Sequence, residues 1–474
     1  MSTSSADTTR FLTNREFPDQ EKAYIQKLLL LATNDLRHVE EQIARLACQQ
    51  AKLASNIFHY KVAIAPHKML PEHILQLIFQ WCIPPDGLCV PTPCDRGLAW
   101  PSFTQVCSSW RKLAMDSTPE LWRDVTMELK LDRYNGCRID LAHQWLSRAG
   151  DMPRSLKIQH MIDSAWECPD CEDVGSRLVV PFRFRSLDLA LSSNQFRRVL
   201  SLLPQTQSLE SLQLTGESPE SFPPTIYEGC SAYNLIAALP WSQLLHLSIN
   251  NATTSASTLI NVLGNCLVLE QLSMILCPDP ASCNAPASFI TLPSLKKLKL
   301  YFVTGSNPEI FFHSLILPQI ESLDMTMTNF HTESMPGCTS LHFATMAQRS
   351  GMSRIHDLCL GKGVEPYRLV DLLKYTPSLS YLEVSGDVVF DSETLEDMST
   401  GQLGPNIRTL YLPHVEDSLG ILEMIWMRGQ NDKNLVTPTL YVTIPVADRN
   451  IAEVWVDKLQ DLGIDCVYDG EYIS

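Results

Sequence analysis

Residues 295–300 read LKKLKL, and the same arrangement, apolar-x-x-Leu-x-apolar, occurs at eight other places along the chain. Successive copies begin 25, 35, 25, 26, 25, 35, 24 and 28 residues apart. Such near-constant spacing indicates a stack of one repeated supersecondary unit, with insertions in the two longer intervals. The copies are FRSLDL (184–189), LESLQL (209–214), LLHLSI (244–249), LEQLSM (269–274), LKKLKL (295–300), IESLDM (320–325), IHDLCL (355–360), LSYLEV (379–384) and IRTLYL (407–412).

Each copy predicts a short strand, and the residues before it predict a helix. In three repeats, apolar residues stand ten, nine and six positions before the copy, which places them on one helical face. They are Val199, Leu200 and Leu203; Leu259, Ile260 and Leu263; and Leu369, Val370 and Leu373. We expect parallel strands at residues 187–189, 212–214, 247–249, 272–274, 298–300, 323–325, 358–360, 382–384 and 410–412.

A period of 20–29 residues with this leucine pattern is that of leucine-rich repeats. The sequence therefore predicts a mixed α and α/β fold, with a solenoid over residues 150–440 whose parallel strands line the concave side of a horseshoe. SLKI at 155–158 reads as a degenerate extra copy, and residues 441–474 read as a strand–helix–strand cap.

Residues 21–65 predict one long helix with a heptad pattern. Apolar residues from Ile25 to Ile64 recur in alternating steps of four and three, broken only by Gln50, until Pro66 ends the series. This period is typical of a coiled coil or a long docking helix. Self-association and packing against the rest of the chain remain equally open. Residues 1–20, rich in Ser, Thr and Asp, read as a disordered tail.

Residues 66–127 predict a small helical module. HKMLPEHILQLIFQWC (67–82) gives a short apolar helix, and residues 103–114 give a second one. Between them, the Pro- and Gly-rich insertion 83–99 predicts an irregular loop. A few short helices can bury only a small core. We therefore expect an exposed apolar groove that binds another protein. The alternative is a plain helical bundle, whose core would use the same residue types.

The order of motifs in this module resembles that of F-box proteins. It comprises Leu70-Pro71-Glu72, then Ile78-Phe79, then Val106-Cys107-x-x-Trp110 and finally Leu121-Trp122. With the heptad helix upstream, it looks like the F-box proteins with irregular leucine-rich repeats that are abundant in mushroom-forming fungi. Departures are the long insertion and His73, where an acidic or small residue is common.

The resemblance implies binding to the Skp-type linker of a cullin–RING ubiquitin ligase. By the matching positions, the linker would contact Leu70, Pro71, Ile74, Leu75, Ile78, Phe79, Val106 and Trp110, while Trp122 would close the module. Ubiquitin would then be transferred by other subunits, so the chain itself is expected not to be an enzyme.

Composition narrows the remaining possibilities. The formal charge of −16 and the absence of a basic run argue against nucleic acid as a partner. The N-terminus lacks the apolar core of a signal peptide, and no stretch reaches the roughly 18–20 apolar residues that span a bilayer. We therefore expect a cytoplasmic or nuclear protein. Fifteen scattered cysteines read as reduced thiols. The single pair Cys168 and Cys171 lacks a second pair for zinc, so it reads as an exposed loop.

No phosphate-loop, zinc-protease or serine-hydrolase motif occurs, so neither a catalytic residue nor a cofactor is expected. Two functions remain: a substrate adaptor of the ligase, and a ligase-independent scaffold in which the helical module only caps the repeats. For the adaptor, the outward residues of the strands would bind an unknown protein target. Among the outward residues, Lys299 and Glu383 are candidates that carry charge. Aromatic residues dominate binding hot spots, so anchors are expected near Tyr301, Phe302, Tyr381 and Tyr411.

Overall fold

The computed structural model describes most of the helices and strands of the chain. The described residues are 16–91, 101–129, 135–160, 175–190, 199, 202, 208–215, 239–278, 289–303, 306, 309–328, 340–361, 367–385, 388–412, 417–431, 439–442, 454–455, 458–459 and 466–468. They form two compact units, residues up to Leu75 and residues from Gln76 onward. The tail at residues 1–15, the pair Cys168 and Cys171, and Leu200 and Leu203 lie outside the described ranges.

The first unit consists mainly of the 45-residue helix α2 (Asp19–Ala63), which confirms the predicted long helix. Asp19 and Glu21 in its first turn and Lys61 in its last turn complement the helix dipole. None of its residues is buried. A short 3-10 turn (Pro66–Lys68) follows it.

The boundary between the units falls inside helix α3 (Glu72–Trp81). Within the second unit, a 3-10 turn (Ser102–Gln105), helix α4 (Ser108–Asp116) and a second 3-10 turn (Pro119–Trp122) follow. The Cys107 side chain caps α4 by accepting a hydrogen bond from the Trp110 backbone N–H at 3.5 Å. This part of the predicted helical module is therefore helical.

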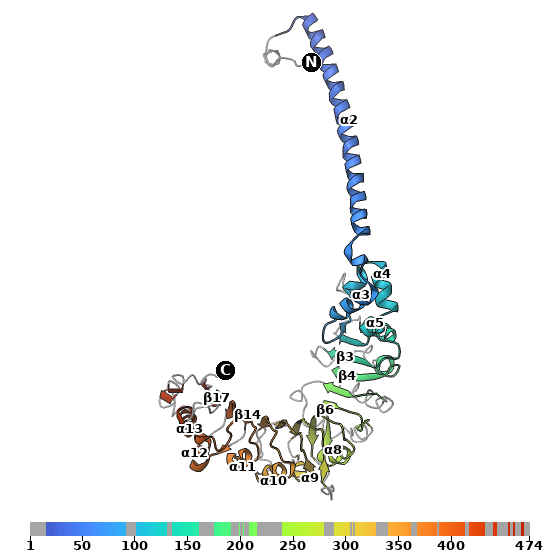
Figure 1. The fold of residues 1–474 in the computed structure, drawn as a ribbon. Helices are drawn as coiled ribbons and strands as arrows, with labels where there is room; N and C mark the ends of the chain where they lie inside the picture. Colours follow the sequence, from blue (N-terminus) through green and yellow to red (C-terminus); the bar gives the residue numbers. More distant parts are fainter. Residues whose placement is uncertain are drawn as a thin grey trace. The chain divides into compact units, whose positions relative to one another are not determined.

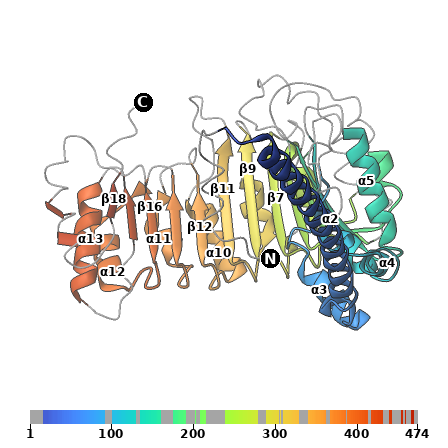
Figure 2. The same cartoon turned by 90° about the horizontal axis from the view of Figure 1, so that it is seen from above.

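Within the described residues, the second unit is built on one sheet of 14 strands, and every neighbouring pair of strands is parallel. Figures 1 and 2 show the strands following one another across the sheet in chain order. They are β1 (Leu88–Cys89), β2 (Asp124–Leu129), β3 (Arg154–His160), β4 (Phe184–Ala190), β5 (Ser211–Thr215), β6 (His246–Ser255), β7 (Gln271–Cys277), β9 (Lys297–Val303), β11 (Ser322–Thr328), β12 (Asp357–Leu360), β14 (Tyr381–Val384), β16 (Thr409–Leu412), β17 (Thr439–Val442) and β18 (Cys466–Tyr468). All nine predicted strands are present, so the predicted parallel sheet is confirmed.

Helices connect the strands and lie along one side of the sheet (Figure 1). They are α5 (Asn135–Arg148), α8 (Ala256–Leu263), α9 (Glu309–Ser314), α10 (Ser340–Ser350), α11 (Leu369–Leu373), α12 (Ser392–Thr400) and α13 (Ser418–Asn431). Two pairs of two-residue strands, β8 (Ile290–Thr291) with β10 (Leu315–Ile316) and β13 (Tyr367–Arg368) with β15 (Val388–Val389), accompany them.

The core lies between this helical layer and the sheet. The motif leucines are buried on the helix side of the strands, as in Leu298 and Leu300 of β9. The predicted helical faces meet them: Leu259, Ile260 and Leu263 on α8 are buried, as are Leu369 and Leu373 on α11. Each repeat therefore completes its core with its neighbours.

Backbone hydrogen bonds fix the spacing between repeats. The N–H of the second motif residue donates to the C=O of the equivalent residue one repeat earlier, as from Glu270 to Leu245 at 2.8 Å and from Lys296 to Glu270 at 2.8 Å. Gly361, just after β12, marks a close approach: a Cβ there would lie 2.8 Å from Thr326 Cα on β11.

The sheet begins earlier in the chain than the sequence predicted. The insertion 83–99, expected to be an irregular loop, contributes β1, and the end of the expected all-helical module contributes β2. Val90 N–H donates to the Thr126 C=O at 2.8 Å, and Leu88 and Val90 are buried. A short buried edge strand carries no motif leucines, which is why the repeat pattern did not indicate it.

Candidate functional site

The sheet face opposite the helices carries a continuous row of side chains, called here the central row. The strand register aligns one residue from each of nine consecutive strands, so the predicted outward positions stand side by side. The central row is Asp188, Gln213, Ser248, Ser273, Lys299, Asp324, Cys359, Glu383 and Tyr411. It is polar apart from Cys359 and the ring of Tyr411, so this face can recognise a partner through hydrogen bonds and charge.

Lys299 organises the middle of the row. Its Nζ lies 2.7 Å from Asp324 Oδ2 and 5.1 Å from the centre of the Tyr301 ring. Burial lowers the pKa of Lys299, but the hydrogen bonds to Asp324 and Tyr301 outweigh it and hold that pKa above its ordinary value. Asp324 also accepts a hydrogen bond from Thr326 at 2.9 Å. This group is therefore positioned before any partner arrives.

A second group lies two strands further along. The Tyr381 hydroxyl donates to Glu383 Oε2 at 2.7 Å, and Ser385 donates to Glu383 Oε1 at 3.4 Å. Burial, and then the hydrogen bond to Glu383, raise the pKa of Tyr381. Cys359 stands between the two groups, and burial together with the charges of Asp324 and Glu383 raises the pKa of its thiol. The local field here is negative.

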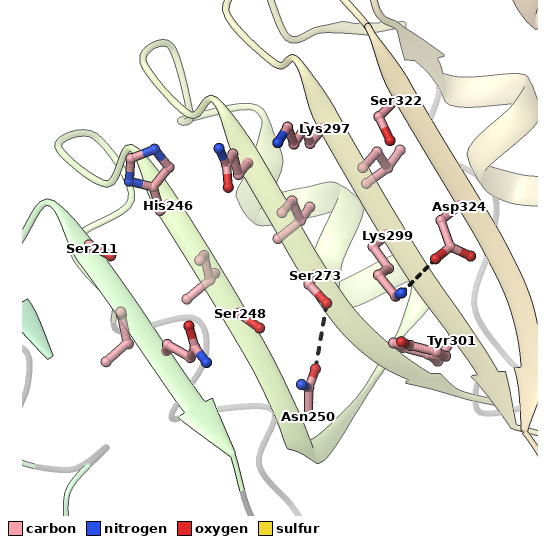
Figure 3. A pocket seen from close by; sticks show the side chains of 16 residues that line it. Ser211, His246, Ser248, Asn250, Ser273, Lys297, Lys299, Tyr301, Ser322 and Asp324 are labelled. Atoms are coloured by element: carbon pink, nitrogen blue, oxygen red, sulfur yellow. Dashed lines mark hydrogen bonds and ion pairs between the residues drawn. The ribbon is translucent and has the colours of Figure 1, made fainter. Parts of the chain in front are cut away.

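A hollow of about 520 Å³ lies over strands β5 to β11 (Figure 3). Hydroxyl, amide, imidazole and ammonium groups surround it, and Figure 3 shows Lys299 directed toward Asp324 and Ser273 toward Asn250. The Ser273–Asn250 contact is 3.5 Å long. The hollow accepts a polar segment more readily than an apolar one.

Five of the six candidate target-binding residues lie on this one face, but they do not lie in one line. Lys299, Glu383 and Tyr411 belong to the central row, whereas Tyr301 follows it and Tyr381 precedes it by one outward position. Phe302 was wrongly expected to reach a partner. It is buried on the helix side, where its ring centre lies 6.4 Å from that of Phe311 on α9. Side chains alternate along a strand, so Phe302 and Tyr301 face opposite sides.

The candidate linker-contact residues are divided between the two units. In the first unit, Leu70 and Pro71 are exposed, Ile74 is half-buried and Leu75 is buried. In the second unit, Val106 is exposed, and Ile78 and Trp110 are half-buried.

Phe79 belongs to the interior of the second unit. It is fully buried, stacks on Phe103 with ring centres 4.9 Å apart, and meets Trp110 edge-to-face at 5.2 Å. Phe79 therefore packs α3 against α4 and, contrary to the expectation from the sequence, is not accessible to a linker protein.

Two exposed side chains on α3 were missed from the sequence. Leu77 is 50% exposed and Trp81 is 88% exposed. They stand four residues apart and so share one face of the helix. That spacing was the available signal, because the motif order that resembles F-box proteins includes neither position.

Trp122 connects the helical segment to the sheet. It is buried, its Nε1 donates to the Ala114 C=O at 2.8 Å, and its ring meets that of Trp145 on α5 edge-to-face at 5.6 Å. Trp122 therefore joins the helical segment between β1 and β2 to α5, which connects β2 to β3.

Among the described residues, one group could hold a metal ion. The Nε2 atoms of His313 and His342 lie 3.2 and 3.6 Å from Glu309 Oε1, and the three ligand atoms are within 4.8 Å of one another. Imidazole–carboxylate contacts explain the same arrangement without an ion. The sequence showed only the Glu309–His313 spacing, because His342 comes from a different helix.

Comparisons with known proteins add no assignment: no protein-family model and no curated protein matches the chain. Within the described ranges, no helix has both the length and the apolar character needed to cross a bilayer.

Proposed function

We propose that this protein is the substrate-recognition adaptor of a Skp–cullin–F-box type ubiquitin ligase. Helix α3 and the segment after it bind the Skp-type linker, and the sheet binds a protein target in the cytoplasm or nucleus. The chain performs no chemistry in this proposal, because the ubiquitin-transferring groups belong to other subunits.

The exposed apolar pair on α3 is the observation that carries the proposal. A tryptophan that is 88% exposed on a helix, one turn from a half-exposed leucine, leaves in water a surface of the kind that forms binding hot spots. The pair lies inside the segment whose motif order resembles F-box proteins. Leu77 and Trp81 therefore join the exposed or half-buried candidates as the linker-contact residues of the proposal, whereas Leu75 and Phe79 are buried. Those candidates are Leu70, Pro71, Ile74, Ile78, Val106 and Trp110.

The target half of the proposal rests on the central row. We propose that the parallel sheet is the concave face of a leucine-rich-repeat horseshoe. The mixed charges of Lys299, Asp324 and Glu383 make this surface selective, because a partner must match their positions to replace the water that they lose. Tyr411, 36% exposed, is the most exposed of the three candidate tyrosines on this face.

A ligase-independent scaffold is the second candidate, and one observation favours it. Strands β1 and β2 belong to the sheet, and Trp122 packs on Trp145 of α5. A helical segment that continues directly into the solenoid has the position of an N-terminal cap, which repeat arrays require.

Binding of the purified full chain to a Skp-type linker separates the two functions. We expect a micromolar or tighter complex with the adaptor and none with the scaffold. Trp81→Asp should weaken the complex at least about thirtyfold, as expected for a hot-spot residue. Gln80→Asp is the matched control, because it adds the same charge at the adjacent exposed position. A wild-type chain that fails to bind the linker refutes the adaptor.

The target surface needs a separate test. Replacing Lys299, Glu383 and Tyr411 together with Ala should remove specific proteins from those that co-purify when the proteasome is blocked, while the linker stays bound. An unchanged set of co-purifying proteins shows that the target binds elsewhere.

A further inference from the structure

The apolar residues of helix α2 that recur in steps of four and three, called here the seam, are exposed from Leu29 onward. Ile25 and Ala32 aside, its large apolar members from Leu29 to Ile64 are each about half to three-quarters exposed. Isolated helices derive little stability from propensity alone, and most helices depend on packing of an apolar face. A helix of 45 residues with no buried residue therefore needs a partner for this face.

The steps of four and three fix the heptad phase. A position followed by a step of three is an a position, and one followed by a step of four is a d position. These positions alternate over more than five heptads, whereas three or four heptads identify a coiled coil. The a positions are Leu29, Leu36, Ile43, Gln50, Ile57 and Ile64, and the d positions are Ile25, Ala32, Val39, Leu46, Leu53 and Tyr60.

We propose that α2 pairs with the α2 of a second copy of this chain as a parallel, in-register, two-stranded coiled coil. The seam residues favour two strands: β-branched Ile43 and Ile57 at a, with Leu46 and Leu53 at d, is the combination that selects dimers.

Gln50 selects the parallel orientation. In a parallel pair each a residue meets its own copy, so the two Gln50 amides face each other and can hydrogen-bond. In an antiparallel pair an a residue meets a d residue, and those from Ile25 to Leu53 are apolar, so the amide would be buried without a partner. An antiparallel pair could place Gln50 opposite Tyr60, the one polar d residue, but the two helices would then overlap over less than three heptads.

The flanking charges oppose this orientation only weakly. Asp35 occupies a g position and Glu40 the following e position, so these carboxylates approach each other in a parallel pair. Both are exposed, and like charges at the surface are largely screened at physiological salt. The buried amide outweighs them.

The mass of the full chain in solution tests the partner. The monomer is 53.3 kDa, and we expect twice that mass by light scattering at micromolar concentration. Ile43→Lys with Ile57→Lys should halve the mass. Ala44→Lys with Phe58→Lys, the same charges one residue further along on the outer face, should not. A monomeric wild type, a dimeric seam variant, or a monomeric control variant would each overturn the proposal.

Cysteine cross-linking tests the orientation. In a Cys48→Ser background, Leu46→Cys places two thiols at the same d layer of a parallel pair, so a mild two-electron oxidant should join them as a disulfide. Ala44→Cys on the outer face should cross-link at the background rate. Equal cross-linking of the two variants, or none above background for Leu46→Cys, would exclude the in-register parallel pair.

Discussion

Replacing Phe79 tests whether this residue supports the helical segment from inside or contacts a partner. Phe79→Ala removes a fully buried ring that stacks on Phe103 at 4.9 Å and meets Trp110 at 5.2 Å. Truncation of a buried phenylalanine costs about 3–5 kcal/mol of stability, since the cavity closes only in part. The expected loss is therefore local and large, with no linker present.

Hydrogen exchange at the amides of α4 measures this loss directly, because Trp110 belongs to that helix. A reduction of about 3–5 kcal/mol in the free energy of local opening corresponds to exchange roughly 100- to 4000-fold faster. Trp81→Ala is the matched control: its side chain lies in water, so it should change the same free energy by less than about 0.5 kcal/mol.

The reverse pattern would refute the reasoning. If Phe79→Ala leaves α4 exchange within about threefold of the wild type while weakening linker binding as strongly as Trp81→Ala does, the ring is a surface contact. The interior assigned to this segment would then be wrong.

Three further outcomes follow from individual residues of the sheet unit. Burial and nearby carboxylates raise the pKa of the Cys359 thiol, so iodoacetamide should alkylate it slowly at pH 8.5, and Glu383→Gln should speed the reaction, as measured by mass spectrometry. Arg428→Met should lower the free energy of unfolding by about 2–4 kcal/mol in urea, because the buried guanidinium donates to three backbone carbonyls at 2.8–3.1 Å; exposed Arg408→Met should change it by less than about 0.5 kcal/mol. Gly361→Ala should lower the melting temperature, since its Cβ would lie 2.8 Å from the backbone of β11 and overpacking costs about 1–3 kcal/mol; an unchanged melting temperature would contradict the close approach.

The repeats could be predicted because the short motif in each one determines its local structure. A motif such as LKKLKL places Leu298 and Leu300 on the buried side and Lys299 on the open side by alternation alone. Equivalent motif positions then pair across neighbouring strands, so the central row followed from the sequence without any knowledge of long-range contacts. The heptads of α2 are predictable for the same reason, since the pattern is local.

The parts that could not be predicted depend on neighbours distant in sequence. Strand β1 exists because Thr126, on a strand 37 residues later in register, accepts the Val90 N–H. Phe79 and Trp81 are both large and aromatic, and only the packing of Phe103 and Trp110 decides which of them is buried. Likewise, nothing in the sequence brings His342 beside Glu309, because separate helices provide them.

The two ends of the sheet bear on how the protein avoids polymerising through its backbone. Within the described residues, the sheet ends at β1, two residues long, and at β18, three residues long. An exposed edge offers unpaired N–H and C=O groups to any extended chain, and aggregation through such edges requires several of them in succession. The edge at β1 provides too few donors and acceptors to template another strand. Deleting the C-terminal residues from Thr439 onward would leave β16, four residues long and rich in apolar side chains, as the new margin, and such a truncated chain is expected to form fibrils or precipitate where the full chain does not.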